Sequence, residues 1–414
     1  MKKAIYLLLV TFIFLYVTNC SCNGTSGRNI DNNPSLSAPE VVSKPVLNVF
    51  LENSGSMDGY VNGNNAEFAS TIYRYLSLID NSGSIKDSID LNYINSEVIP
   101  LGNDITKFSS KELTPSSFRN MGGKRVSTDI SKLLETVLGK TNNDTISMLI
   151  SDLIFSPGSG VDASKYLVDQ ETEIMGLITR KFNNSNLAIV IHQLNSNFNG
   201  TYFNKVDSRS NINNSRPYFI CFFGEEKYLE QIPFDVLLDD DFISTHFENK
   251  YIVSKEQSVK YAVQVGSGNF ELDRRNTQKS IIKARIDNRT NNLSCVVNVN
   301  FDILLLDDSY LTNKSNYIID ENFQLEEIKP TVIEGFTHSI KWSTTIPQST
   351  TLSIGLSNSI PDWVYQTSDS SGEDLIKDDA IDKTYGLKYL IEGIHEPYSR
   401  ASDYYTEIKI NINQ

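Results

Sequence analysis

The stretch Val46-Leu-Asn-Val-Phe-Leu-Glu-Asn-Ser-Gly-Ser-Met57 is an apolar run that ends in a short polar segment. This segment carries one carboxylate and two hydroxyls at alternate positions, Glu52, Ser54 and Ser56. Because alternate side chains of an extended backbone point to the same side, these three are predicted to lie together at the end of a buried strand. Open α/β sheets bind ligands at the carboxyl ends of their strands, and small hard cations take oxygen ligands. The pattern therefore favours a cation site.

Two later segments offer further oxygen ligands. Thr128 comes just before an apolar stripe with helical spacing, which consists of Ile130, Leu133, Leu134, Val137 and Leu138. Asp152 ends a second apolar run, 146–152, and the proline and glycines that follow it indicate a loop. The order of the three segments supports the prediction of a cation site.

In these residues the chain resembles the von Willebrand factor type A (vWA) domain. The metal-ion-dependent adhesion site of that family reads Asp-x-Ser-x-Ser after the first strand, Thr in a middle loop and Asp after the fourth strand. These positions fall on Glu52, Ser54, Ser56, Thr128 and Asp152. The resemblance implies a bound divalent cation, Mg²⁺ or Mn²⁺ with Ca²⁺ as an alternative. It implies that the hydroxyls ligate the cation directly or through water, that the two acids supply charge, and that a carboxylate of a protein partner fills the open position.

Glu52 stands where the family usually has Asp. Glutamate keeps the charge but adds a methylene, which moves the carboxylate relative to the two serine hydroxyls. Mg²⁺ requires near-ideal octahedral geometry with ligands at about 2.0–2.1 Å. Three outcomes stay open: the longer carboxylate reaches the cation directly, acts through a water molecule, or prevents cation binding and leaves a metal-free structural relic.

The beginning of the chain has the pattern of an export signal. Two lysines precede a short apolar run from Ala4 to Val17, which is typical of a secretory signal peptide, predicted over 1–19. The segment Val17-Thr-Asn-Cys20 resembles a bacterial lipoprotein signal of the looser Bacteroidota type, which implies that Cys20 is acylated. A cleaved secreted protein and an uncleaved anchor are the alternatives. Residues 20–45 are polar and contain prolines, so they are predicted to form a flexible, lipid-anchored tether.

Residues 46–240 alternate predicted strands with predicted helices, which indicates an α/β domain with a mostly parallel sheet and helices on both faces. Within it, the Asn/Ser-rich segment 195–216 is interpreted as an insertion that could form an exposed hairpin. Residues 241–276 are a connector that the pattern does not assign. Residues 277–414 read mainly as strands separated by turns, with one short helical stretch near 387–394, and predict a C-terminal β-sandwich domain.

Composition limits the classes of function. The net charge is −14, or about −16 once Lys2 and Lys3 leave with the signal peptide, and no basic patch is present, so nucleic acid is a poor candidate partner. The four histidines lack metal-ligand spacing, and no recognisable nucleophile or acid/base pair occurs, so we predict no enzymatic activity. Trp363 is interpreted as a core or edge residue of the sandwich, with stacking on a sugar as the alternative.

Together these features predict a lipoprotein of the cell envelope, with the outer membrane favoured and its periplasmic or surface side left open. Its vWA-like domain would present a cation to an unknown protein partner, in adhesion or in the assembly of an envelope complex. Two alternatives stay open: a metal-free structural subunit of an envelope assembly, and a surface hydrolase.

Overall fold

A computed structural model describes residues 43–62, 66–86, 89–125, 129–158, 160–203, 209–276, 278–346, 348–372 and 380–414. The predicted signal peptide, Cys20, most of the predicted tether and Thr128 lie outside these ranges. Within them, no helix is both long enough and apolar enough to cross a membrane.

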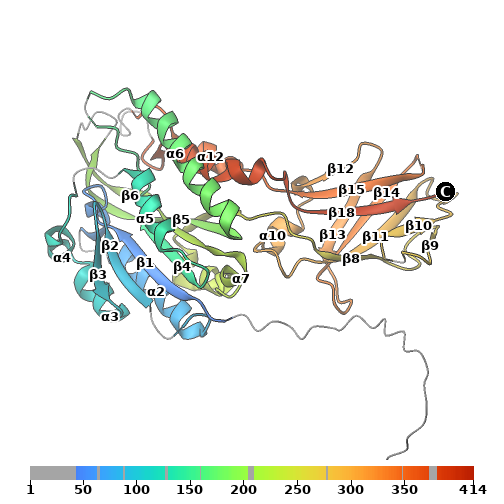
Figure 1. Ribbon diagram of the computed structural model, residues 1–414, viewed down its shortest axis with the longest axis horizontal. Helices are drawn as coiled ribbons and strands as arrows, with labels where there is room; N and C mark the ends of the chain where they lie inside the picture. Colours follow the sequence, from blue (N-terminus) through green and yellow to red (C-terminus); the bar gives the residue numbers. More distant parts are fainter. Residues whose placement is uncertain are drawn as a thin grey trace, which may run out of the picture. The chain divides into compact units, whose positions relative to one another are not determined.

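The first half of the described chain is built on a mixed seven-stranded sheet (Figure 1). Its strands are β1 (Val46–Glu52), β2 (Ile89–Ile94), β3 (Val98–Gly102), β4 (Thr145–Ser151), β5 (Leu187–Phe203), β6 (Arg209–Glu225) and β7 (Phe247–Val253), in the order β3-β2-β1-β4-β6-β5-β7. Strand β1 pairs in parallel with β2 and β4. The other pairings of this sheet are antiparallel. The predicted α/β class is therefore confirmed, whereas the predicted mostly parallel sheet is corrected to a mixed one.

The difference arises from one long hairpin. Strands β5 and β6 pair from Leu187↔Glu225 to Phe203↔Arg209, so the segment 195–216 extends two core strands and is not a separate insertion. Strand β6 then returns between β4 and β5 and pairs antiparallel with both. Two antiparallel strands can be joined by a short turn, whereas two parallel strands need a long crossover connection. Long connections precede β2 and β4, whereas β6 follows its hairpin partner β5 directly along the chain.

Helices connect these strands and cover both faces of the sheet. They are α1 (Asp58–Val61), α2 (Glu67–Ser82), α3 (Ile105–Lys107), the π-helix η1 (Phe108–Glu112), α4 (Pro115–Asn120), α5 (Ile130–Lys140), α6 (Ala163–Asn184), α7 (Glu226–Leu229), α8 (Phe234–Asp239) and α9 (Asp241–Ser244). Helix α2 packs with α8 and α9, and α5 packs with α6. Strands β2 and β4 lie on opposite sides of β1.

The sequences of α2 and α5 explain why these two helices form where they do. In α2, Phe68, Ile72, Tyr75, Leu76 and Ile79 are buried on one stripe, and Gly83 ends the helix in the left-handed conformation that glycine adopts without strain. In α5, the Asp129 carboxylate caps the first turn by accepting a hydrogen bond from the Lys132 amide.

The second half contains three further sheets. The two larger ones have the orders β12-β15-β18-β10-β9 and β13-β14-β11-β8, and the third pairs β16 with β17. The elements are β8 (Lys260–Val263), β9 (Glu271–Leu272), β10 (Ser280–Ile282), β11 (Leu293–Asn300), α10 (Asp308–Leu311), the 3₁₀-helix η2 (Lys314–Asn316), β12 (Tyr317–Ile319), β13 (Gln324–Pro330), β14 (His338–Thr344), β15 (Thr350–Ser357), α11 (Asp362–Gln366), β16 (Ser368–Asp369), β17 (Thr384–Tyr385), α12 (Leu387–Ser399) and β18 (Tyr404–Ile412). Side chains from both larger sheets form one apolar cluster, which surrounds Trp342.

Helix α12 does not belong to that cluster. Its buried residues, including Leu390, Ile391 and Ile394, join the core of the first sheet, where α12 lies beside α6 (Figure 1). The chain thus leaves the second cluster after β15, contributes α11 and α12 to the first core, and returns as β18.

The edge strand β7 is capped by side chains from the C-terminal part of the chain. The Lys250 carbonyl accepts a hydrogen bond from Trp363 Nε1 (3.3 Å), and the Ile252 carbonyl accepts one from the Tyr405 hydroxyl. Asn358 Nδ2 donates to the Ser254 carbonyl just after the strand (3.2 Å). Since an unpaired strand edge is a template for unwanted pairing, these caps both protect the sheet and join it to the second half.

Two glycines let α1 approach the long hairpin. A Cβ added to Gly200 would lie 2.6 Å from the Gly59 Cα, and a Cβ added to Gly59 would clash with the Phe198 ring. The close approach lets Tyr60 of α1 pack against Phe198, with ring centroids 5.0 Å apart. The hairpin and the loop after β1 are therefore held together by a contact that only glycine allows.

We expect Gly200→Ala to lower the free energy of unfolding by about 1–3 kcal/mol, because the added methyl group must push backbone aside. Gly139→Ala in α5 is the matched control, since a Cβ there meets nothing within 4 Å, and it should raise stability by roughly 0.5–1 kcal/mol. Urea unfolding of both variants measures this difference. Equal effects of the two substitutions would contradict the close approach.

Candidate metal centre

The parallel pairing of β1 with β4 brings two acidic positions together. Leu51 pairs with Ile150, so the last residues of the two strands, Glu52 and Ser151, are neighbours. Glu52 is 1% exposed, and its carboxylate accepts a hydrogen bond from the Ser151 hydroxyl. Asp152 follows directly and is also 1% exposed. Two carboxyl groups are thus buried side by side at the carboxyl end of the sheet.

Asp152 is only partly satisfied by hydrogen bonds. Its Oδ1 accepts from the Ile154 amide (3.3 Å), whereas its Oδ2 is buried and has no hydrogen-bond partner among the described residues. Burial, and after it the charge of Glu52, raises the pKa of Asp152 to about 7, although the Ser56 hydroxyl opposes this shift. An unpartnered buried carboxylate oxygen is costly unless something else offsets it.

The backbone after Asp152 is strained. Leu153 has a φ of 51°, a conformation that is uncommon for residues other than glycine. The Leu153 amide donates to the Ser151 hydroxyl (2.8 Å), the same hydroxyl that donates to Glu52. Ser151 therefore links the strained turn to the buried acid pair.

The two predicted serines lie beside each other in the loop after β1. Their Oγ atoms are 2.9 Å apart, and Ser54 is 4% exposed. The Ser56 hydroxyl lowers the pKa of Asp152, against the larger effect of burial. Such an effect requires the Ser56 hydroxyl to lie next to the Asp152 carboxyl group. The structure therefore brings together Glu52, Ser54, Ser56 and Asp152, while Thr128 lies outside the described residues.

Arg125 holds this loop, and the sequence interpretation missed it. Its guanidinium contacts Asn53 Oδ1, the Ser54 carbonyl (3.1 Å) and the Asp58 carboxylate, and its own carbonyl accepts from the Gly55 amide (3.0 Å). The arginine precedes Thr128 by three positions. Its sequence signal is weak, because its partners lie about 70 residues away in the chain.

Arg216 is a second residue that the sequence interpretation missed. It is 1% exposed, donates to the carbonyls of Ile381 (2.9 Å) and Lys383 (3.5 Å), and stacks over the Tyr202 ring at 4.8 Å. Its charge lowers the pKa of Asp152, against the larger effect of burial. Arg216 lies in the segment interpreted as an insertion, where a buried cation was not expected.

These residues fit a hard cation. Two buried carboxyl groups, one with an unpartnered oxygen, lie next to two hydroxyls, and carboxylate and hydroxyl oxygens are the donors that Mg²⁺ and Ca²⁺ take. No group of three or more His, Cys, Asp or Glu side chains with the geometry of a metal site occurs in the described part of the chain. The predicted site contains only two carboxylates, so it would depend on hydroxyls for its other ligands.

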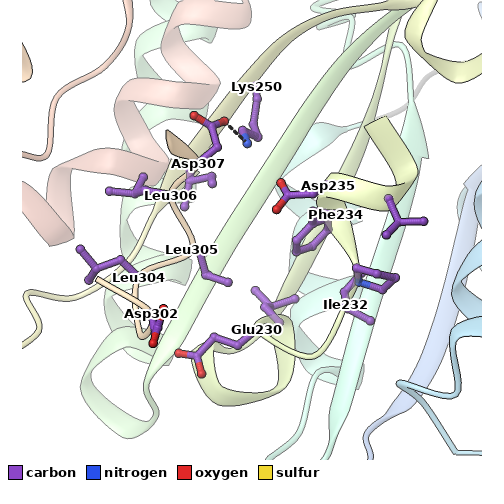
Figure 2. A pocket seen from close by; sticks show the side chains of 14 residues that line it. Glu230, Ile232, Phe234, Asp235, Lys250, Asp302, Leu304, Leu305, Leu306 and Asp307 are labelled. Atoms are coloured by element: carbon purple, nitrogen blue, oxygen red, sulfur yellow. Dashed lines mark ion pairs between the residues drawn. The ribbon is translucent and has the colours of Figure 1, made fainter. Parts of the chain in front are cut away.

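One hollow of the surface lies next to this centre, and another lies apart from it. A polar cleft of about 420 Å³ opens beside Gly55 and is lined by Asp58, Asn62 and Arg119 together with hairpin residues 199–201. Figure 2 shows a separate hollow of about 300 Å³, where the Lys250–Asp307 ion pair lies beside several leucines. None of the predicted site residues lines this second hollow.

No protein-family model, no curated protein and no solved structure matches this chain. The vWA resemblance therefore depends on the site residues and their order alone.

We expect Asp152→Asn to stabilise the protein in EDTA at about pH 8, and this advantage should disappear as the pH falls. The pKa of Asp152 is about 7 when folded and ordinarily 3.8, so its contribution to stability is fully present below about pH 4 and is lost as the pH rises through 7. Asparagine cannot ionise. The difference at pH 8 should exceed about 1 kcal/mol, because one pKa unit corresponds to about 1.4 kcal/mol.

Urea unfolding across about pH 5–8 measures this effect, with Asp235→Asn as the control because Asp235 is an exposed carboxylate away from the acid pair. The parent and Asp235→Asn should lose stability relative to Asp152→Asn as the pH rises. Parallel pH profiles for all three proteins would contradict a buried, proton-binding Asp152.

Proposed function

We propose that this chain binds a divalent cation, Mg²⁺ or Mn²⁺ with Ca²⁺ as an alternative, between the ends of β1 and β4. Glu52, Ser54, Ser56 and Asp152 would hold it, together with Thr128. The observation that carries this proposal is the buried, unpartnered Oδ2 of Asp152 next to a second buried carboxyl group. A cation there would offset two charges whose burial is otherwise unfavourable.

The proposal extends to the architecture and to the partner. The parallel strands β1, β2 and β4 would be the core of a vWA-like domain, and the two larger of the later sheets would form a β-sandwich. A cation incompletely coordinated by the protein supplies a Lewis acid that attracts a carboxylate of a protein partner. The polar cleft beside Gly55, with Arg119 half exposed in its wall, gives such a partner room next to the site.

A metal-free structural subunit is the second candidate, and Arg216 is the observation that favours it. A buried arginine near Asp152 already supplies positive charge, and a proton shared by the acid pair could supply the rest. In that case the acid pair would be a structural feature, and the chain would take part in an envelope assembly without a cation.

Melting of the purified full-length protein distinguishes the two candidates. Saturating Mg²⁺ or Mn²⁺ should raise the melting temperature by a few degrees over EDTA, since a ligand at one hundred times its dissociation constant adds about 2.7 kcal/mol. Ser54→Ala/Ser56→Ala should abolish the rise. The apparent affinity should increase from about pH 6 to 8, because Asp152 must lose its proton before it ligates.

Ser82→Ala/Ser84→Ala is the matched control, because these hydroxyls are also two residues apart and hydrogen-bonded to each other (2.7 Å) but lie at and just beyond the C-terminal end of α2. It should keep the full response to metal. An unchanged melting temperature in every cation, or an equal loss in both double variants, would favour the metal-free subunit.

We further propose that the chain is a lipoprotein anchored through Cys20 to an envelope membrane. The support is the signal pattern in the sequence, and an acyl chain adds about 0.8 kcal/mol of membrane affinity per buried methylene. Cys20→Ala should shift the exported protein from the membrane fraction to the soluble fraction. Cys295→Ala, which changes a buried free thiol, should leave the fractionation unchanged. Equal membrane association of the parent and Cys20→Ala would exclude this anchor.

A further inference from the structure

A second cleft, which shares no residue with the candidate metal centre, lies along the edge strand β7. It has a volume of about 440 Å³, within the range of roughly 300–1,000 Å³ that is usual for small-molecule sites. Residues 247–252 form one wall. The other walls come from the segment 306–316, from Trp363 of α11 and from Tyr405 of β18.

The aromatic side chains of this cleft are held by hydrogen bonds at their polar ends. The bonds are Trp363 Nε1 to the Lys250 carbonyl (3.3 Å), Tyr310 hydroxyl to the Ser357 carbonyl (2.7 Å), Tyr405 hydroxyl to the Ile252 carbonyl, and Tyr251 hydroxyl with His395 Nδ1 (2.8 Å). Tyr251 and Tyr405 are each only 2% exposed and form the floor of the cleft. Trp363 and Tyr310 are partly exposed, and because their donors are used within the protein they offer a ligand their ring surfaces and not their polar groups. Their orientations are also fixed before any ligand arrives.

The charged groups of the cleft are engaged as well. Lys250 forms an ion pair with Asp307, which Figure 2 shows from the neighbouring hollow, and Glu248 accepts a hydrogen bond from Asn195 (2.9 Å). No other charged side chain among the described residues lines the cleft. An anionic ligand would therefore meet no uncompensated positive charge, because the only cation of the lining among the described residues is paired with Asp307.

The remaining polar groups are amides and hydroxyls. They belong to Asn249, Asn313, Asn316, Ser309 and Ser359. An amide side chain has an NH₂ group that donates two hydrogen bonds and an oxygen that accepts them. It can therefore bind two neighbouring hydroxyl groups of a ligand. Asn249 and Asn316 each use an amide donor within the protein, on Gln193 (2.8 Å) and on the Tyr310 carbonyl (2.9 Å), and the Ser309 hydroxyl donates to Asp307 (2.6 Å). The cleft thus combines ring surfaces with neutral groups that keep a second amide N–H and acceptor oxygens for a ligand.

We propose that this cleft binds a neutral saccharide. The C–H faces of a sugar ring pack on aromatic rings, and its hydroxyls pair with amides and hydroxyls, so both parts of the lining are used. A proline-rich peptide is the obvious competitor, because such peptides dock in aromatic grooves. Such a peptide offers mainly carbonyl acceptors, because proline has no N–H, so it would use the donors of this lining and leave the acceptor oxygens of its amides unused. A neutral saccharide therefore fits the lining better.

The chain contains a built-in probe for this site. It has two tryptophans: Trp363 lines the cleft, whereas Trp342 is fully buried in the second apolar cluster. In Trp342→Phe, the remaining indole emission reports on the cleft alone. Full-length protein would be titrated with maltohexaose, cellohexaose, xylohexaose, mannohexaose and chitohexaose by calorimetry, and Trp342→Phe would be titrated by fluorescence in parallel.

We expect at least one of these saccharides to bind and to change the emission of Trp363. Trp363→Ala should weaken binding at least about tenfold, whereas Trp363→Phe, which keeps a ring, should stay within a few-fold of the parent. Ser359→Phe, at an exposed position of the lining, should block binding by filling the cleft without removing any bond described above. The melting temperature of each variant shows that it is folded.

Each outcome of these saccharide titrations either supports or overturns the proposal. Ser54→Ala/Ser56→Ala should bind the saccharide like the parent, because the two sites share no residue. The absence of millimolar binding by all five saccharides would overturn the proposal, as would binding that survives both Trp363→Ala and Ser359→Phe. Binding of decaproline in place of every saccharide would assign the cleft to a peptide instead.

Discussion

The parallel alignment of β1 and β4 is the constraint on which the candidate centre depends. It places Glu52 and Asp152 at the same end of the sheet, where both are almost fully buried. Burial, and after it the like charge of Glu52, raises the pKa of Asp152. The surrounding structure, from the strained Leu153 to the loop held by Arg125, is arranged around this pair.

The local parts of this arrangement could be predicted from the sequence. The apolar stripes of α2 and α5 and the buried runs of β1 and β4 have strong periodicity, and the polar residues that end the strands follow them directly. The position of β6 could not be predicted in this way, because strand order depends on contacts between distant segments. The Asn-rich composition of 195–216 also hid an alternating buried face that includes Phe198, Tyr202 and Ile212.

The C-terminal part of the chain shows the same limit: contacts between distant segments could not be predicted from local sequence patterns. Helix α12 was recognised from its apolar pattern, but nothing in that pattern says which core it joins, and it packs on the first. The caps on β7 are likewise invisible to sequence reasoning, since Trp363, Tyr405 and Asn358 donate to backbone carbonyls more than a hundred residues away. Side-chain to backbone contacts of this kind carry no complementary pattern in the partner.

Three groups could offset the negative charge of the acid pair: Arg216, a proton and a bound cation. Arg216 is a buried positive charge that lowers the pKa of Asp152, but two carbonyls and the Tyr202 ring hold its guanidinium, so moving it toward Asp152 would leave those acceptors unpaired. The remaining ways to offset the pair are a proton and a cation. A proton suffices below about pH 7 and is progressively lost above it. In mildly alkaline solution the proposed cation would offset the charge that the proton no longer offsets, and that is the physical argument for proposing one between β1 and β4.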